Sequence, residues 1–226
     1  VYQAMIPPQA DMTVVEFYIS ATDVSELQRT WPAPTLESGQ ATNALFQVID
    51  AFDENAVWGP ESHPAYFEIM TGAERSEFTD IKRASDAQMN ATFISVNQDG
   101  VDVRYNTGVR IRGSGSRRAN PPNNRINFAS DDPWNGVTAI NLNVDNVQDQ
   151  IAGSILHRIA GLPAAEAKAV TMYSNGVDLR EGRFYAHVEP LNNHFAEKHF
   201  PSDDNGNLYK GRRPNESPPG GRGAGL

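Results

Sequence analysis

A loop rich in glycine and serine follows an arginine-bearing segment near the middle of the chain, and this combination could bind a phosphate group. The loop consists of Gly113, Ser114, Gly115, Ser116 and Arg117. Glycine lets consecutive backbone N–H groups converge on one anion, serine adds hydroxyl donors, and Arg117 or Arg118 would supply positive charge. No Gly-Lys-Ser/Thr sequence follows, so the segment is not a Walker loop. The alternative, which the local sequence by itself favours, is an ordinary hairpin tip.

Arginine is concentrated around this loop. Six arginines lie within residues 104–125, namely Arg104, Arg110, Arg112, Arg117, Arg118 and Arg125, and only four of the 19 basic residues of the chain are lysine. The planar guanidinium fork suits carboxylates and phosphates. The alternative is a solvated face of alternating strand positions that pairs with the acidic N-terminal third. Nucleic acid is not expected as a partner, because the isoelectric point is near 5.0 and no aromatic residues interleave the arginines.

The composition excludes several classes of site. The 226 residues contain no cysteine, which rules out disulfides, thiolate zinc sites, iron–sulfur clusters and a cysteine nucleophile. The histidines at 187, 194 and 199 do not form a His-Glu-x-x-His motif, and Asp203–Asn207 lacks the later glutamate of a calcium loop, so no metal site is expected. No stretch approaches the roughly 20 apolar residues that cross a membrane.

Charge divides the chain unevenly. Residues 1–80 hold thirteen acidic residues against two arginines, a net charge of −11, which leaves +2 for the remainder because the whole chain carries −9. We expect three parts. An acidic N-terminal part over residues 1–87 includes an insertion, a core covers 88–211, and a flexible Gly/Pro-rich tail covers 212–226. The tail has almost no apolar residue to bury.

Short apolar segments separated by turn residues predict an antiparallel sheet with a packed helix, and therefore the α+β class. The predicted strands cover residues 12–19, 91–96, 101–105, 109–112, 125–128, 137–142, 169–173 and 183–188. The predicted turns lie at 97–100, 106–108 and around Asn175 and Gly176. The insertion over 31–87 is expected to contain a strand and a helix of its own.

Three helices are predicted. The main one covers about 146–160, and its apolar stripe consists of Val147, Ile151, Ile155, Leu156 and Ile159. This spacing predicts that the stripe is buried against the sheet. The shorter helices are expected at residues 23–28 and 190–199.

Several motifs together resemble the spore-coat CotH family of atypical, kinase-like proteins. They are Asn106-Thr-Gly-Val-Arg-Ile-Arg-Gly-Ser-Gly-Ser-Arg, Arg125-Ile-Asn-Phe, Asp132-Pro-Trp-Asn-Gly, Ile140-Asn-Leu-Asn, Ala160-Gly-Leu-Pro-Ala, Tyr173-Ser-Asn-Gly, Phe184-Tyr-Ala-His-Val-Glu-Pro and Gly206-Asn-Leu-Tyr-Lys-Gly. Their order and spacing agree with the family over residues 88–211, and residues 12–30 resemble its N-terminal strand and helix.

This resemblance implies the small lobe of a protein kinase that transfers phosphate from ATP, with Mg, to serine or threonine of secreted or cell-surface proteins. It implies that Gly113–Arg117 form the nucleotide loop and that Arg125 contacts phosphate. Asp149 is the nearest acid on the packed helix that could hold Arg125, although Gln150 could occupy the matching position. Glu189 would lie beside the nucleotide at the lobe junction.

The family's transfer and metal-binding aspartates follow the segment that matches 206–211, so no catalytic residue can be assigned in this chain. We expect the N-terminal part of a longer kinase, inactive by itself, whose partner is a protein substrate. The alternative is a non-catalytic module of a coat, cell-surface or filament assembly. That alternative predicts exposed apolar patches or strand edges on residues 31–87, which an assembly partner would cover.

Overall fold

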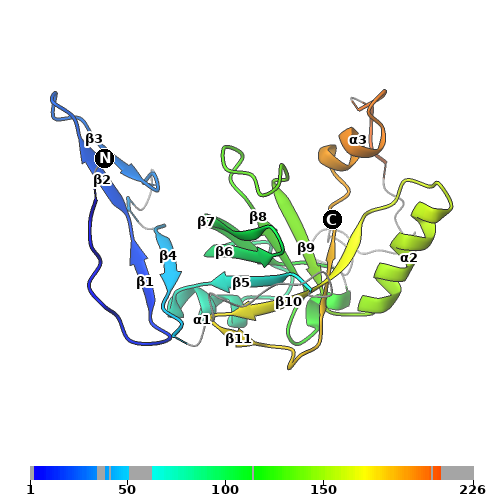
Figure 1. Cartoon of the computed structure of the whole chain (residues 1–226), viewed down its shortest axis with the longest axis horizontal. Coiled ribbons are helices and arrows are strands. Elements are labelled where there is room, and N and C mark those ends of the chain that lie inside the picture. Colours follow the sequence, from blue (N-terminus) through cyan, green and yellow to red (C-terminus); the bar gives the residue numbers. More distant parts are fainter. Residues whose placement is uncertain are drawn as a thin grey trace.

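The computed structural model describes residues 3–34, 39–40, 42–50, 63–113, 115–204 and 206–209. Ser114 and the predicted tail over 212–226 lie outside these residues. A β-barrel occupies the centre of the molecule, with two N-terminal β-ribbons on one side and the helices α2 and α3 on the other (Figure 1).

Seven strands form the barrel. In their order around it they are β5 (Ala65–Ile69), β6 (Met89–Asn97), β7 (Gly100–Ile111), β8 (Asn124–Asn127), β9 (Ala139–Asn143), β12 (Tyr185–Val188) and β10 (Ala167–Ser174). Six of the seven neighbouring pairs are antiparallel, and the seventh, between β10 and β5, is parallel. A short strand, β11 (Val177–Asp178), extends β10 as a hairpin.

The predicted fold, an antiparallel sheet with a packed helix resembling a kinase small lobe, is wrong. The sheet closes on itself, because β5 pairs with β6 along one edge and with β10 along the other, where Ala65 lies opposite Thr171. Closure removes the open edges of a sheet. Residues 65–69 fall within the expected insertion over 31–87, but their side chains are largely buried and complete the barrel.

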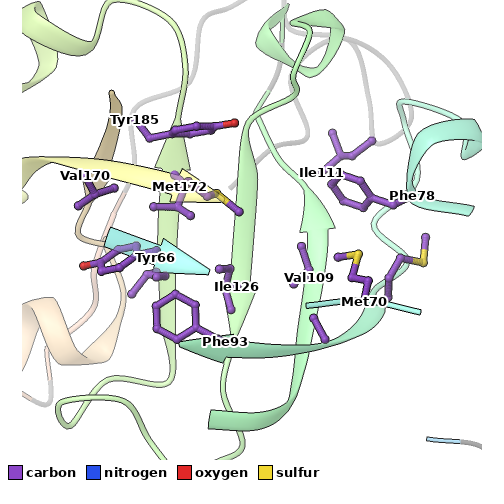
Figure 2. Close-up of a cluster of buried hydrophobic side chains, with 14 of the residues drawn as sticks. Tyr66, Met70, Phe78, Phe93, Val109, Ile111, Ile126, Val170, Met172 and Tyr185 are labelled. Carbon is purple, nitrogen blue, oxygen red and sulfur yellow. The ribbon is translucent and has the colours of Figure 1, made fainter. Parts of the chain in front are cut away.

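The barrel interior is a continuous apolar core. Tyr66, Phe93, Ile126, Val170 and Tyr185 are each 1% exposed or less and converge from five strands (Figure 2). Complete burial of a large apolar side chain contributes about 1.5–3 kcal/mol. Because burial favours the apolar face of each strand, the alternation of apolar and polar residues fixes which side chains face inward.

One predicted turn lies inside a strand. The residues 106–108 were expected to connect two strands, whereas β7 continues through them. Asn106 has a φ of 52°, and the register of β6 against β7 shifts between Ala91 and Phe93. The Asn-Thr-Gly sequence thus produces a β-bulge, which uses the same left-handed backbone conformation as a turn.

The helix α2 (Val147–Ile159) lies at the predicted position and packs against β10 and β12. Its apolar stripe is only partly covered, because Leu156 is 65% exposed and Ile159 is 78% exposed. The shorter helix α3 (Asn193–His199) buries Phe195. None of the described helices is long and apolar enough to span a membrane.

The N-terminal residues form two ribbons beside the barrel. The strand β1 (Val14–Phe17) pairs with β4 (Ala44–Gln47), and β2 (Ile19–Thr22) pairs with β3 (Gln28–Trp31). The helix predicted over 23–28 is a turn, because Asp23 Oδ1 accepts hydrogen bonds from the N–H groups of Ser25 and Leu27 at 2.8 and 2.9 Å. The insertion contributes the helix α1 (Gly72–Asp80).

Candidate functional site

Strands β7, β8 and β9 place polar side chains on the outer surface of the barrel, opposite to the core. Along β7 and just beyond it, Arg110 and Arg112 alternate with the buried Val109 and Ile111. Arg125 of β8 lies directly opposite Arg110 in the register. We call Arg110, Arg112 and Arg125, together with Asn127, Asn141 and Asn143, the arginine face.

Neutral amide groups hold the two central arginines of this face. Arg125 donates from Nε to Asn127 Oδ1 at 2.8 Å and from Nη1 to Asn141 Oδ1 at 3.4 Å. Arg112 donates to Asn143 Oδ1. An amide oxygen orients a guanidinium without neutralising its charge. Within the described residues, the other N–H groups of the two guanidinium forks have no side-chain acceptor and can donate to an anion.

The charge of the arginine face is not balanced. Arg110 forms an ion pair with Asp86 at 2.8 Å, whereas no carboxylate of the described residues lies within 4.0 Å of Arg112 or Arg125. Burial, and then the neighbouring arginines, lower the pKa of Arg112 to about 10. The same two causes lower the pKa of Arg125, with Arg110 as the neighbour. A bound anion would relieve this repulsion.

The predicted nucleotide loop is held by contacts of its own. Arg117 is only 8% exposed and donates to the carbonyl oxygens of Gly113, Arg83 and Ser85 at 2.8–3.0 Å, as well as to Asp86. Ser116 Oγ accepts from Asn123 Nδ2 at 2.8 Å. Gly115 begins a short 3-10 helix that ends at residue 118. Arg117 therefore ties the loop to the segment after α1, and most of its N–H groups already have acceptors.

Glycine at position 113 is required by its backbone conformation. Gly113 has a φ of +103°, and a Cβ atom there would lie 2.2 Å from Ser116 Oγ. Only glycine tolerates both conditions without a shift of the neighbouring groups. The sequence prediction of a special role for this glycine is consistent with the loop, but the role seen here is the sharp entry into the 3-10 helix.

Asp149 does not hold Arg125. It is exposed in the first turn of α2, and none of the described ion pairs includes it. The neighbouring Gln150 instead accepts from Asn143 Nδ2 at 2.6 Å, and Asn143 in turn accepts from Arg112. The helix thus contacts the arginine face through an amide chain.

Glu189 lies on the other side of the barrel wall. Val188, the last residue of β12, pairs with Asn141, whose side chain reaches Arg125. Glu189 is the next residue in the chain, so its side chain points away from the arginine face. Its carboxylate contacts Lys198 at 3.4 Å and His199 at 3.3 Å. The structure therefore does not bring all the predicted residues into one cleft.

Sequence analysis named Arg112 only as one of six clustered arginines, and it assigned no role to Asn141 and Asn143. The signal was present in the alternation of Asn141 and Asn143 with Ile140 and Leu142, which is the mark of a strand with one polar face. Among the described residues, no group of three or more His, Asp or Glu side chains could hold a metal ion. No protein-family model matches the chain, and no curated protein matches it.

Proposed function

We propose that this chain is the phosphate-binding part of a CotH-like protein kinase that acts on secreted or cell-surface proteins, and that Arg112 and Arg125 bind the phosphates of ATP. The observation that supports the proposal is the pair of outward-facing guanidinium groups that have no carboxylate partner among the residues that the structure describes. Phosphate oxygens accept two parallel hydrogen bonds from one guanidinium group. The motifs of residues 106–211 add the resemblance, whereas the closed barrel and the position of Glu189 do not support a kinase lobe.

The groups on the arginine face fit phosphate oxygens better than magnesium. They are guanidinium and amide groups. Within the described part of the chain, Asp86 supplies the only carboxylate in contact with them, and it already binds Arg110 and Arg117. Mg²⁺ requires oxygen ligands in near-octahedral geometry. Magnesium would therefore arrive with the nucleotide. The acids that orient the hydroxyl in such kinases are expected after the segment matched by residues 206–211.

Isothermal titration of the chain with ATP, inorganic triphosphate and adenosine tests this proposal. We expect ATP and triphosphate to bind and adenosine not to bind, because the face recognises phosphate. The variants Arg112→Gln and Arg125→Gln should each weaken triphosphate binding by about tenfold or more, since each removes a charge-assisted hydrogen bond. Binding should also weaken as salt is added.

Arg118→Gln is the matched control. Arg118 is an exposed arginine six residues from Arg112, and its substitution removes the same charge from the surface. Triphosphate affinity should change little in this variant. Equal losses in all three variants would show a general charge effect and contradict a site, and so would unchanged affinity in the Arg112 and Arg125 variants.

A second candidate function is supported by the ribbon of β2 and β3. All four residues of β2 are exposed, and large apolar side chains reach solvent from the ribbon and its turn, namely Ile19, Val24, Leu27 and Trp31. Within the described residues neither strand pairs with a third, so both outer edges carry unpaired backbone groups. These features fit a module of an assembly. They were predicted on residues 31–87, but all of them except Trp31 lie before that range.

We test a second copy of this chain as the partner that covers the ribbon of β2 and β3. Edge pairing of two ribbons would bury the apolar side chains of both copies. Sedimentation should show self-association that depends on concentration, and Ile19→Lys should abolish it by placing a charge on the edge. The control is Val101→Lys. Val101 is also an exposed apolar residue, but it lies on β7 and not on the ribbon. A parent chain that stays monomeric at high concentration would contradict self-assembly through the ribbon.

A further inference from the structure

A cavity of about 420 Å³ lies at the end of the barrel, on the side opposite to the arginine face. Strands β10 and β12, the loop before β9 and the start of the α3 segment surround it. Its lining includes Trp134, Val137, Lys168, His187, Glu166 and Glu189. This volume falls within the range of small-molecule sites in proteins. Except for Glu189, none of these residues was assigned a role by the sequence.

The floor of the cavity is aromatic and uncharged. His187 Nδ1 lies 2.9 Å from the Tyr66 hydroxyl, and the His187 ring lies 5.7 Å from the ring of Trp134. Trp134 Nε1 donates to Ser95 Oγ at 2.9 Å, so the indole is fixed in place. Burial, and then the charge of Lys168, lower the pKa of His187 to about 3. The imidazole is therefore neutral at physiological pH.

The carboxylates at the rim already have cationic partners. Glu166 contacts Lys198 at 2.9 Å and Arg158 at 3.7 Å. Glu189 contacts Lys198 and His199. Around the cavity, and with His187 neutral, three cationic side chains therefore accompany two carboxylates. The surplus is one positive charge.

Lys168 carries this surplus charge. Its register places it opposite His187 and on the inward-facing side of β10. The ammonium group lies 5.9 Å from the centre of the Trp134 ring. Within the described residues it makes no hydrogen bond and no ion pair. Loss of solvent around the amine lowers the pKa of Lys168. Glu166 acts in the opposite direction on this pKa, but its carboxylate contacts Lys198 and Arg158 and forms no ion pair with Lys168. A cation over an indole ring, without an ion-pair partner among the described residues, leaves room for an anionic group from a ligand.

We propose that this cavity binds a small organic acid, with its carboxylate on Lys168 and its flat apolar part against Trp134. A single carboxylate matches the single surplus charge, whereas a phosphate dianion would require more cations than the cavity has free. A cationic ligand would meet Lys168, and a purely apolar ligand would leave the ammonium without a partner. The walls formed by Val137 and Ala139 supply apolar surface for the body of the acid.

Benzoate is the probe for this site, because it combines one carboxylate with a flat ring. Isothermal titration of the full chain should show saturable binding of benzoate below about 10 mM, with benzamide, its neutral analogue, at least about tenfold weaker. Lys168→Gln should remove this preference for the acid. Lys82→Gln, a change at an exposed lysine outside the cavity, should leave it unaltered.

A labelling experiment on the unaltered chain tests the same site without depending on whether the Lys168→Gln variant folds. An amine-acylating reagent should modify Lys168 readily near neutral pH, because a lowered pKa increases the neutral amine. Benzoate should protect Lys168 and should not protect Lys82, as measured by peptide mass spectrometry. Equal binding of benzoate and benzamide, absence of benzoate binding, or equal labelling of Lys168 with and without benzoate would each overturn the proposal.

The two proposed sites can fail independently. Arg112 and Arg125 lie on the opposite side of the barrel wall from the cavity. The variants Arg112→Gln and Arg125→Gln should therefore leave benzoate affinity unchanged. Lys168→Gln should likewise leave triphosphate affinity unchanged. Loss of benzoate binding in the arginine variants would show that benzoate occupies the arginine face, and this outcome would contradict a separate acid site in the cavity.

Discussion

At the scale of single residues, Glu68 is the most unusual side chain in the barrel. It is 1% exposed and points to the same side of β5 as Tyr66. Its carboxylate lies 3.5 Å from Arg75 and accepts from Ser174 Oγ at 3.3 Å. Burial raises the pKa of Glu68 to about 7, although Arg75 and the Ser174 hydroxyl act in the opposite direction. Desolvation therefore outweighs the ion pair.

We predict that Glu68 makes the free energy of unfolding fall as the pH rises from about 4.5 to about 7. In this window the unfolded chain has lost the Glu68 proton while the folded chain retains it, so folding takes up a proton and weakens with rising pH. A pKa difference of this size corresponds to as much as about 3 kcal/mol. The variant Glu68→Gln should therefore be more stable than the parent at pH 8 and similar to it at pH 4.5.

Urea unfolding at a series of pH values measures this effect. Glu77→Gln is the control, because Glu77 is an exposed glutamate on α1, the helix that also carries Arg75. The lowered pKa of His187 gives stability that is lost as the pH falls below about 6.5, but this contribution is common to all variants and cancels in the difference. A constant difference between Glu68→Gln and the parent across pH would contradict the prediction.

At the scale of elements, one turn connects two parts of the barrel. Asn175 and Gly176 join β10 to β11, and both have positive φ, as a two-residue hairpin turn requires. The Asn175 side chain also accepts from Met70 N at 2.8 Å and donates to Met70 O at 3.0 Å. It thereby fixes the end of β5 next to the turn.

Asn175→Ala should destabilise the protein by about 3 kcal/mol, because it leaves the buried backbone groups of Met70 without partners and places alanine in the left-handed region. Asn135→Ala separates these two causes. Asn135 has a φ of 48°, and its side chain makes no hydrogen bond within the described part of the chain. Its substitution should cost about 1 kcal/mol. Denaturant midpoints that shift equally in the two variants would show that the Met70 contacts contribute nothing.

Local patterns predicted much of what these elements look like, because period-two alternation and turn residues act within a few positions of each other. The strands around 91–96, 125–128 and 169–173 and the helix over Val147–Ile159 are examples. The same patterns cannot distinguish a turn from a bulge at Asn106, since both require a left-handed residue. They also cannot show that Arg117 donates its hydrogen bonds to the carbonyl oxygens of Gly113, Arg83 and Ser85.

At the scale of the whole molecule, the closure of the barrel depends on a pairing between distant segments. Strand β5 lies about a hundred positions before β10, and their parallel register joins Ala65 to Thr171 and Glu68 to Ser174. An apolar run such as residues 65–69 predicts a buried strand and says nothing about its neighbours. For this reason the local patterns predicted an open sheet, and the arginine-bearing strands were assigned to a kinase lobe.

Amide hydrogen exchange tests this closure. In a closed barrel the amides that join β10 to β5, such as Thr171 N to Pro64 O at 3.0 Å, should be as protected as those between β8 and β9. The ribbon of β2 and β3 has little buried surface and should exchange about a thousandfold faster, through local opening.

Thr171→Pro should open the barrel, because it removes this donor at the β5–β10 pairing, and both strands should then exchange faster and the protein lose stability. Ile19→Pro is the matched control and should affect only the ribbon, since Ile19 is 57% exposed and belongs to β2. If β5 and β10 of the parent already exchanged as fast as the ribbon, the seam would be open in solution. An open edge would then be available on the barrel itself, and the arginine-bearing strands would again belong to a sheet that a second domain could complete.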